Sequence, residues 1–262
     1  MTAYVRRQSL LELLRKQAGL RVTELSEALG VSEGTIRNDL NALEKEGKLE
    51  RVHGGAVLKD QERFQNTSFL RRFQQNAPAK RAIARRAAVL VNDGDSILLD
   101  ASSTAYYLAR ALKERKRLRV MTNGFEVARE LAQNLSNTVI LIGGVVNADS
   151  SSVTGLLSEK IIAEMHMEKA FFSCSAFSFE RGMTEVHLEE AQLKRKAIES
   201  SKQVIALVDS AKIGKEDLTP FAHLGQISHL FTDSGLSPEL SEALKRVGIS
   251  FTICEEETDS NP

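Results

Sequence analysis

The chain has 262 residues, of which 42% are hydrophobic and 27% are charged, a balance typical of a globular protein with room for two domains. No apolar run approaches the roughly 18 residues of a membrane span, and the N-terminus lacks the apolar segment of a signal peptide. We therefore expect a cytoplasmic protein with no membrane partner. The two cysteines, Cys174 and Cys254, show no metal-binding spacing, so we expect no structural metal, and no motif indicates a cofactor.

The formal net charge is zero, but the charges are distributed unevenly along the chain. Residues 1–60 are nearly balanced, with ten basic and nine acidic side chains. Residues 61–90 carry seven basic side chains and one acidic, whereas residues 91–262 carry 18 basic and 25 acidic. This asymmetry is compatible with nucleic-acid binding near the front of the chain, although charge alone does not establish it.

Residues 6–17 and 22–29 are predicted to form two helices, because leucines recur in both at helical spacing. Thr23 is a candidate N-cap of the second helix, and Gly30 is placed to end it. A third helix follows the glycine-containing turn at once. Two short helices joined in this way, behind a supporting helix, are typical of a helix-turn-helix.

The third helix, predicted over residues 32–47, has two different faces. Ile36, Leu40 and Leu43 form an apolar stripe that must be buried. The other side carries hydrogen-bond donors with little bulk, which fits the major groove of DNA. Taken alone, this helix is better explained as an ordinary surface helix, and its neighbours in the chain are what favour DNA binding. The candidate DNA contacts in this region are Thr23, Ser32, Gly34, Thr35, Arg37, Asn38 and Asn41.

Two brief β-type runs then flank His53-Gly54-Gly55 and predict a hairpin, which makes the domain a winged helix-turn-helix. The wing would carry Arg51 and His53 toward phosphates or the minor groove. For His53, a phosphate contact and a simple turn residue are equally supported. Asp39 cannot favourably face phosphate, so we expect it to orient an arginine within the domain.

Residues 3–58 resemble the DNA-binding domain of the DeoR family of bacterial transcription regulators, through Thr35-Ile36-Arg37, Asp39-Leu40 and the run from Val52 to Ala56. The resemblance implies double-stranded operator DNA as the partner, and a homodimer or homotetramer, since two-fold operators require two copies. The family usually has an arginine where this chain has Asn38, and usually no glycine at position 34. Because asparagine can pair with an adenine edge, the operator sequence does not transfer from relatives.

From residue 92 onward, β-like runs alternate with amphipathic helical runs, which predicts a mostly parallel sheet covered by helices. The expected strands cover residues 96–99, 118–122, 138–142, 169–173, 203–208, 227–232 and 249–253. The expected helices cover residues 105–112, 126–133, 156–165, 189–200 and 238–247, after a basic helix near 78–91. The predicted organisation is a winged helix-turn-helix domain over 1–58, a polar linker over 59–77, and an α/β effector domain over 78–256.

Small polar residues follow the expected strands, where ligands bind in such folds. Hydroxyls and backbone N–H groups at a helix N-terminus suit a phosphate, but N-capping by Ser103 or Thr104 explains these residues equally well. The candidate effector-binding residues are Asp100, Ser102, Ser103, Thr104, Thr122, Asn123, Gly143, Gly144, Glu189, Lys194, Asp209 and Lys212.

Residues 75–255 resemble the effector domain of the same family, in the order Leu-Asp-x-Ser-Ser-Thr, Thr-Asn, Gly-Gly, Gly-Met-Thr and Asp-Ser-x-Lys. The resemblance implies a fold similar to ribose-5-phosphate isomerase and a phosphorylated sugar as the effector. It places the phosphate on residues 102–104 and positive charge at Lys194 and Lys212. The sugar would be lined by Asp100, Thr122, Asn123, Gly143, Gly144 and Glu189.

These patterns predict a transcription regulator, a repressor of a carbohydrate-use operon controlled by a phosphorylated sugar. A sugar-phosphate isomerase with an accessory DNA-binding domain is the main alternative, and a DNA-binding architectural protein without an effector is a third. The isomerase relatives carry carboxylates where this chain has Ser173-Cys174-Ser175, which would instead narrow the pocket. Because Cys174 also lacks an evident histidine and acid partner, we expect no catalytic residues and no enzyme activity.

Overall fold

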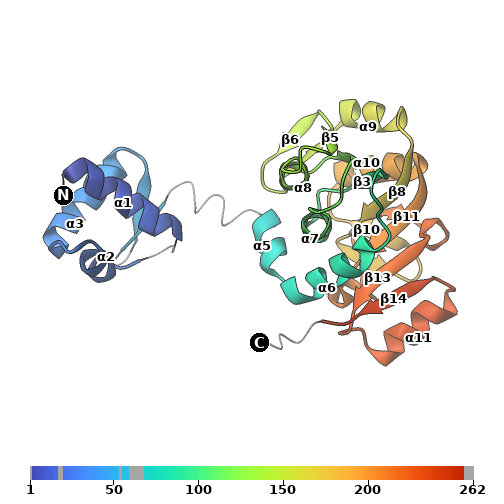
Figure 1. Cartoon of the computed structure of the whole chain (residues 1–262). Helices are drawn as coiled ribbons and strands as arrows, with labels where there is room; N and C mark the ends of the chain where they lie inside the picture. The colour runs from blue at the N-terminus through green and yellow to red at the C-terminus, as the bar shows by residue number, and fades with distance from the viewer. Residues whose placement is uncertain (1, 17–19, 53–54, 59–67, 257–262) are drawn as a thin grey trace. The chain divides into compact units, whose positions relative to one another are not determined.

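The computed structural model describes residues 2–16, 20–52, 55–58 and 68–256, which fall into two compact units divided after Arg71 (Figure 1). The first unit is a winged helix-turn-helix. It contains helices α1 (Ala3–Lys16), α2 (Val22–Leu29) and α3 (Glu33–Lys45), and strands β1 (Leu49–Val52) and β2 (Gly55–Leu58). The strands pair antiparallel, as the predicted hairpin requires. Its tip, His53 and Gly54, lies outside the described residues.

The caps of α2 and α3 explain where these helices begin and end. Gly30 adopts a φ of +64° and ends α2, as predicted. The Ser32 hydroxyl accepts a hydrogen bond from the Thr35 N–H at 3.3 Å and caps α3, also as predicted. The prediction that Thr23 caps α2 is wrong: the N-cap is Arg21, and Thr23 lies exposed inside the first turn.

A buried carboxylate ties α3 to α1. Asp39 is 2% exposed and accepts hydrogen bonds from Arg6 and from Arg7, the latter at 3.0 Å. The expectation that Asp39 orients an arginine within the domain is therefore confirmed. Ile36 and Leu40, on the same side of α3, are fully buried in the core of this unit.

The second unit is built around a seven-stranded sheet in which every neighbouring pair is parallel. In spatial order its strands are β14 (Phe251–Cys254), β13 (His229–Asp233), β11 (Ser201–Leu207), β8 (Met167–Phe172), β3 (Ser96–Leu99), β4 (Arg119–Thr122) and β5 (Thr138–Leu141). All seven overlap the expected strands. The predicted parallel α/β fold is therefore confirmed.

Helices cover both faces of this sheet. Side chains alternate across it, so that Ile97 and Leu99 belong to one core cluster while Leu98, between them, belongs to the other. The first cluster also holds residues of α6 (Ala77–Ala88), α7 (Ser103–Ala111) and α8 (Phe125–Leu131). The second holds residues of α9 (Leu156–Ala163), α10 (Leu188–Glu199) and α11 (Pro238–Arg246).

Several short elements were not predicted. They are helix α5 (Ser68–Gln74), which lies inside the predicted linker, the hairpin of β6 (Val145–Asn147) and β7 (Ser152–Thr154), and a small antiparallel sheet of β9 (Ala176–Ser178), β10 (Gly182–Glu185) and β12 (Thr219–Ala222). Two 3₁₀ turns, Ser210–Lys212 and Leu224–Gln226, complete the described elements. Across the described ranges, no helix is both long and apolar enough to cross a bilayer.

The direction of chain travel reverses between β3 and β8. From β3 the chain moves outward through β4 to β5, then returns to the other side of β3 for β8 and continues to β11, β13 and β14. In open α/β sheets, ligands bind beyond the carboxyl ends of the strands at such a switch point. The loops after β3 and β8 therefore mark the expected ligand site.

The tight packing of Gly144 generates a stability prediction with a matched control next to it in the chain. A Cβ atom on Gly144 would lie 2.3 Å from the Ser158 Oγ and 2.5 Å from the Thr154 carbonyl oxygen, and its φ is +157°. A Cβ atom on Gly143 would meet no atom within 4 Å. We expect Gly144→Ala to lower the free energy of unfolding by about 1–3 kcal/mol and Gly143→Ala to change it by less than about 0.5 kcal/mol, measured by urea denaturation. Equal effects of the two substitutions would contradict this account.

Candidate functional site

Helix α3 presents the predicted DNA-contacting side to solvent. Gly34, Arg37, Asn38 and Asn41 are exposed, opposite the buried stripe. The hydroxyls of Ser32 and Thr35 lie 2.9 Å apart at its start. The helix thus has an apolar back and a small, donor-bearing front, the arrangement that suits insertion into a major groove.

Polar contacts hold the candidate arginines of this surface in place. The Arg37 guanidinium donates to the Glu33 carboxylate at 2.7 Å, and both side chains are exposed. Arg51 of β1 donates to the Asn41 Oδ1 at 2.6 Å and to the Gly55 carbonyl oxygen at 3.3 Å. The Arg51–Asn41 bond fixes the first strand of the wing against α3, so these two candidates act together.

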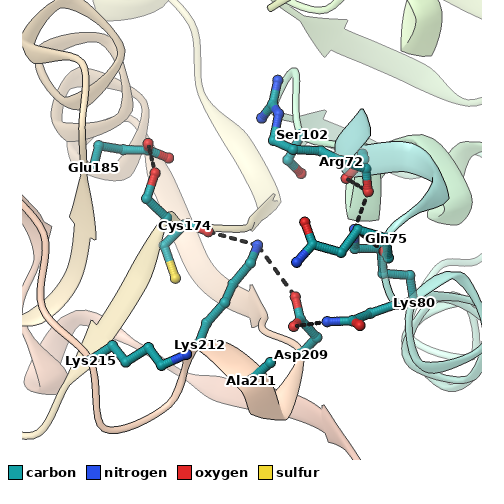
Figure 2. Close-up of a pocket in the computed structure, with 13 residues that line it drawn as sticks. Arg72, Gln75, Lys80, Ser102, Cys174, Glu185, Asp209, Ala211, Lys212 and Lys215 are labelled. Atoms are coloured by element: carbon teal, nitrogen blue, oxygen red, sulfur yellow. Dashed lines mark hydrogen bonds and ion pairs between the residues drawn. The ribbon is translucent and has the colours of Figure 1, made fainter. Parts of the chain in front are cut away.

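The second unit contains a cavity of about 310 Å³ at the switch point of the sheet (Figure 2). It is lined by Arg72, Gln75, Asn76, Lys80, Ser102, Ser103, Cys174, Ser175, Glu185, Asp209, Ala211, Lys212 and Lys215. Four predicted effector residues are in this set: Ser102, Ser103, Asp209 and Lys212. Figure 2 shows the Lys212 side chain reaching into the space between Cys174 on one side and Gln75 and Asp209 on the other.

Asp100 joins the two loops that form the base of the cavity. One of its carboxylate oxygens accepts hydrogen bonds from the Ser102 N–H and hydroxyl, at 3.1 and 2.5 Å. The other accepts the Ser173 N–H at 3.0 Å and lies 3.1 Å from the Lys194 ammonium. Asp100 is 1% exposed, so it supports the site from below rather than lining it.

Lys194 forms hydrogen bonds and ion pairs with buried groups. Its ammonium donates to Glu185 at 2.5 Å and to the Ser173 carbonyl oxygen at 2.9 Å, besides its contact with Asp100. Burial alone would lower its pKa, but the charges of Glu185 and Asp100 outweigh burial and raise the pKa above its ordinary value. The cavity lining does not include Lys194, whose charge is directed at these buried partners, and its role toward the effector stays a prediction.

The cavity wall carries more positive than negative charge. Four cationic side chains line it, Arg72, Lys80, Lys212 and Lys215, against the carboxylates of Glu185 and Asp209. Lys212 donates to the Cys174 carbonyl oxygen at 2.8 Å and lies 3.4 Å from the Asp209 carboxylate. An excess of cations in a partly enclosed space favours an anionic ligand.

Lys80 is the cation most affected by its surroundings. Its ammonium donates to the Gln75 carbonyl oxygen at 2.7 Å and to the Arg72 carbonyl oxygen. Burial, helped by the nearby charge of Lys212, lowers its pKa to about 8. Lys80 therefore changes charge close to physiological pH.

The three hydroxyls predicted to hold a phosphate have different roles. The Ser102 hydroxyl caps α7 by accepting from the Ala105 N–H at 3.1 Å, and the Ser103 hydroxyl donates to the Arg72 carbonyl oxygen at 3.2 Å. The Thr104 hydroxyl is fully buried without a hydrogen-bond partner and lies outside the lining. The N-cap is therefore Ser102, not Ser103 or Thr104.

The other predicted sugar contacts also lie outside this lining. Thr122 is fully buried, and its hydroxyl accepts from the Gly124 N–H at 3.0 Å. Asn123 donates to the Val153 carbonyl oxygen at 3.2 Å. Gly143 and Gly144 are exposed, and Ser158 of α9 donates to the Gly143 carbonyl oxygen at 2.8 Å.

Glu189 is exposed and lines a different hollow, so its expected contact with the effector stays a prediction. The neighbouring Glu190 carries the buried contacts of this turn. It accepts hydrogen bonds from Ser152 at 2.5 Å and from Asn123 at 3.4 Å. A shift of one residue along a helix turns the side chain by about 100°, enough to exchange the two roles.

Sequence reasoning missed the cavity residues of α5 and α6, together with Glu185. Arg72 and Lys80 had a signal, because both belong to the basic run over residues 61–90. Glu185 accepts a hydrogen bond from the Ser175 hydroxyl at 2.6 Å, across the loop after β8. Burial opposes its charge, but Lys194 holds the pKa of Glu185 below its ordinary value.

Cys174 is an unreactive thiol in this setting. It is 4% exposed, and burial raises its pKa to about 12. A nucleophilic cysteine requires a lowered pKa and an accessible thiolate. The expectation of a structural cysteine agrees with these properties.

Comparisons with known proteins assign both units to the same family. Residues 6–62 match the model of a DeoR-like helix-turn-helix domain, and residues 75–234 match that of the DeoR C terminal sensor domain. The HTH-type transcriptional regulator GolR of Listeria innocua is 38% identical, over 97% of this chain and 100% of its own length. The lactose phosphotransferase system repressor of Streptococcus mutans is 35% identical, over 87% of this chain and 91% of its own length. Ribose 5-phosphate isomerase from Methanocaldococcus jannaschii is 18% identical with a TM-score of 0.37, over 53% of this chain and 55% of that one, too distant to indicate function.

The lowered pKa of Lys80 predicts how the cavity responds to pH. A bound anion stabilises protonated Lys80, so binding takes up a proton above pH 8, and affinity falls as the pH rises from 7 to 9. Sulfate is a suitable probe because it remains doubly charged throughout. We expect its affinity, measured by thermal shift at constant ionic strength, to fall severalfold over this range. In Lys80→Arg, whose guanidinium stays charged, the affinity should remain flat, and a flat wild-type profile would rule out Lys80 as a contributor.

Proposed function

Because this chain belongs to the DeoR family of transcription regulators, we propose that it represses a carbohydrate-use operon and that a phosphorylated sugar controls its binding to the operator. The observation that carries the effector part is the cavity at the switch point, where four cations face two carboxylates. A sugar phosphate supplies the anion that such a wall favours, and its hydroxyls can donate hydrogen bonds to the carboxylates. The name of the Streptococcus mutans relative, a repressor of a sugar system, supports the repressor assignment.

In this proposal residues 1–58 bind the operator through α3 and the wing, residues 78–256 form the effector domain, and residues 59–77 connect them. Arg37, Asn38 and Asn41 face the groove, while Arg51 contacts the backbone at the wing. A two-fold operator requires at least two copies of the chain, so the protein acts as a homodimer or homotetramer.

The connection itself contributes to the cavity wall, which supports a route from effector to DNA. Arg72 of α5 and the following Gln75 line the cavity. Phe73, between them in sequence, stacks on Tyr107 at a centroid distance of 4.9 Å. An effector that binds Arg72 therefore alters the packing of α5, the segment that connects the effector domain to the DNA-binding domain. The change in DNA affinity is limited by the difference in effector affinity between the two states.

We propose that the protein is not an enzyme. An isomerase needs a carboxylate base positioned to move a proton between adjacent carbons. Glu185 is the cavity carboxylate nearest to such a role, but its pairing with Lys194 and its lowered pKa make it a weak base. The high pKa of Cys174 argues against nucleophilic catalysis.

The DNA-binding surface is tested by Arg37→Ala. Because Arg37 is exposed on the front of α3, its loss should weaken binding to the protein's own promoter DNA by at least about tenfold. Fluorescence anisotropy at fixed salt measures the affinity. The control is Arg129→Ala, which removes an arginine paired with Glu126 in the second unit and should leave the affinity unchanged. If the two variants bind the promoter DNA with equal affinity, Arg37 does not contact DNA.

The effector site is tested by Lys212→Met in the same assay. In the wild type, one phosphorylated sugar from a panel should change DNA affinity while its unphosphorylated counterpart does not. Lys212→Met should keep the DNA affinity and lose at least about tenfold in effector response, because a charge-assisted contact to the phosphate disappears. Lys245→Met, an exposed lysine paired with Glu242, is the control and should respond as the wild type does.

The same panel distinguishes the alternatives. If the protein exchanges protons of a sugar phosphate with deuterated water and binds no DNA, it is an isomerase and the proposed regulatory function is wrong. DNA binding that no member of the panel alters would contradict sugar-phosphate control.

A further inference from the structure

Six large apolar side chains gather at one end of the α/β unit and remain 46% to 69% exposed: Val145, Val146, Leu156, Leu157, Val186 and Leu188, which we call the apolar patch. They come from three separate segments, namely β6, the start of α9 and the turn between β10 and α10. In Figure 1, β6 and α9 both lie at the top of this unit. Exposed apolar side chains are ordinarily scattered singly, so a cluster of six requires an explanation.

A hollow joins the three segments into one surface. It measures about 530 Å³ and is lined by Val145, Val146, Gly155 and His187, among others. Gly155 precedes the two leucines of α9, and His187 lies between the two patch residues of its turn. A Cβ atom on Gly155 would lie 3.4 Å from the Val145 Cγ2, which places the start of α9 directly against β6.

The size of the patch matches what a subunit interface needs. At these exposed fractions the six side chains present on the order of 600 Å² of surface, at the upper limit for the largest patch of an ordinary monomer. A stable interface buries about 800 Å² on each partner, with an apolar centre and a polar rim. The patch supplies most of that centre, and Glu189 and His187 supply polar groups within it.

We propose that the apolar patch is the surface through which two copies of this chain associate. The proposal rests on the proposed function in one respect, that a two-fold operator demands a second copy. A two-fold axis sets the same patch on both partners, so apolar side chains of one copy fill the hollow of the other. The occupant is therefore a second copy of the α/β unit.

The patch also adjoins the effector cavity through a short stretch of chain. Glu185 lines the cavity, and Val186, the next residue, belongs to the patch. Four residues after Val186, Glu190 lines the hollow and accepts a hydrogen bond from Ser152 of the β6–β7 hairpin at 2.5 Å. The interface thus forms on the same segment that closes one side of the ligand site.

Sedimentation of the full chain, with neither DNA nor effector present, tests the proposal independently of the regulatory function. The wild type should sediment as a dimer or larger, and Leu156→Glu should raise the dissociation constant at least about tenfold, since two carboxylates would be buried per interface. Leu156 occupies the first position of α9, where the helix dipole favours a carboxylate, so the variant should still fold. Val145→Glu makes the same change on β6 and should have the same effect.

Leu135→Glu is the matched control. Leu135 is 96% exposed and lies outside the patch, so this variant should keep the wild-type mass. A monomeric wild type, or patch variants that retain the wild-type mass while circular dichroism shows them folded, would overturn the proposal. If the masses change as expected but no DNA is bound, the interface stands and the proposed function fails.

Discussion

The contacts of Asp100 hold together the cavity at the switch point of the sheet. A single carboxylate receives hydrogen bonds from the loops after β3 and β8, which belong to different halves of the sheet, and pairs with Lys194. Lys194 in turn holds Glu185 on β10, so one buried charge network spans the switch point and the small antiparallel sheet. Removing one partner from a buried ion network leaves an uncompensated charge, at a cost of about 3–5 kcal/mol. Two carboxylates share one ammonium in this network, so its formal charge is negative and offsets part of the positive charge on the cavity wall.

How much of this arrangement could be predicted from the sequence depends on what precedes and follows each element along the chain. The seven parallel strands were predictable because continuous apolar runs such as Ile97–Leu99 are flanked by amphipathic helices. The strands β6, β7, β9, β10 and β12 span three or four residues each, close to the length of β3, but they interrupt the alternation of strands and α-helices that marks the large sheet. Their pairing depends on tertiary contacts instead, as when Thr184 bonds to the Ala176 carbonyl oxygen.

The candidate site was predictable only where its residues follow the predicted strands of the large sheet. Ser102, Ser103, Asp209 and Lys212 do so, and all four line the cavity. The residues of α5 and α6 precede the first strand of the sheet, and no local pattern indicates that they fold back over its carboxyl edge. The environment of Lys194 could not be predicted for a different reason: its charge is visible in the sequence, but its pairing with two buried carboxylates is not.

The position of α5 has a consequence for combining this regulator with its relatives. A chimeric regulator is usually made by joining two proteins within the linker between the DNA-binding and sensor domains. In this chain the predicted linker, residues 59–77, offers many junction points. A junction after Gln75 would replace Arg72 and Gln75, together with the backbone carbonyls that Lys80 and Ser103 use, by those of another protein. Such a hybrid would bind its new operator, but part of its cavity lining would come from the other protein. A junction before Ser68 keeps the sensing part whole.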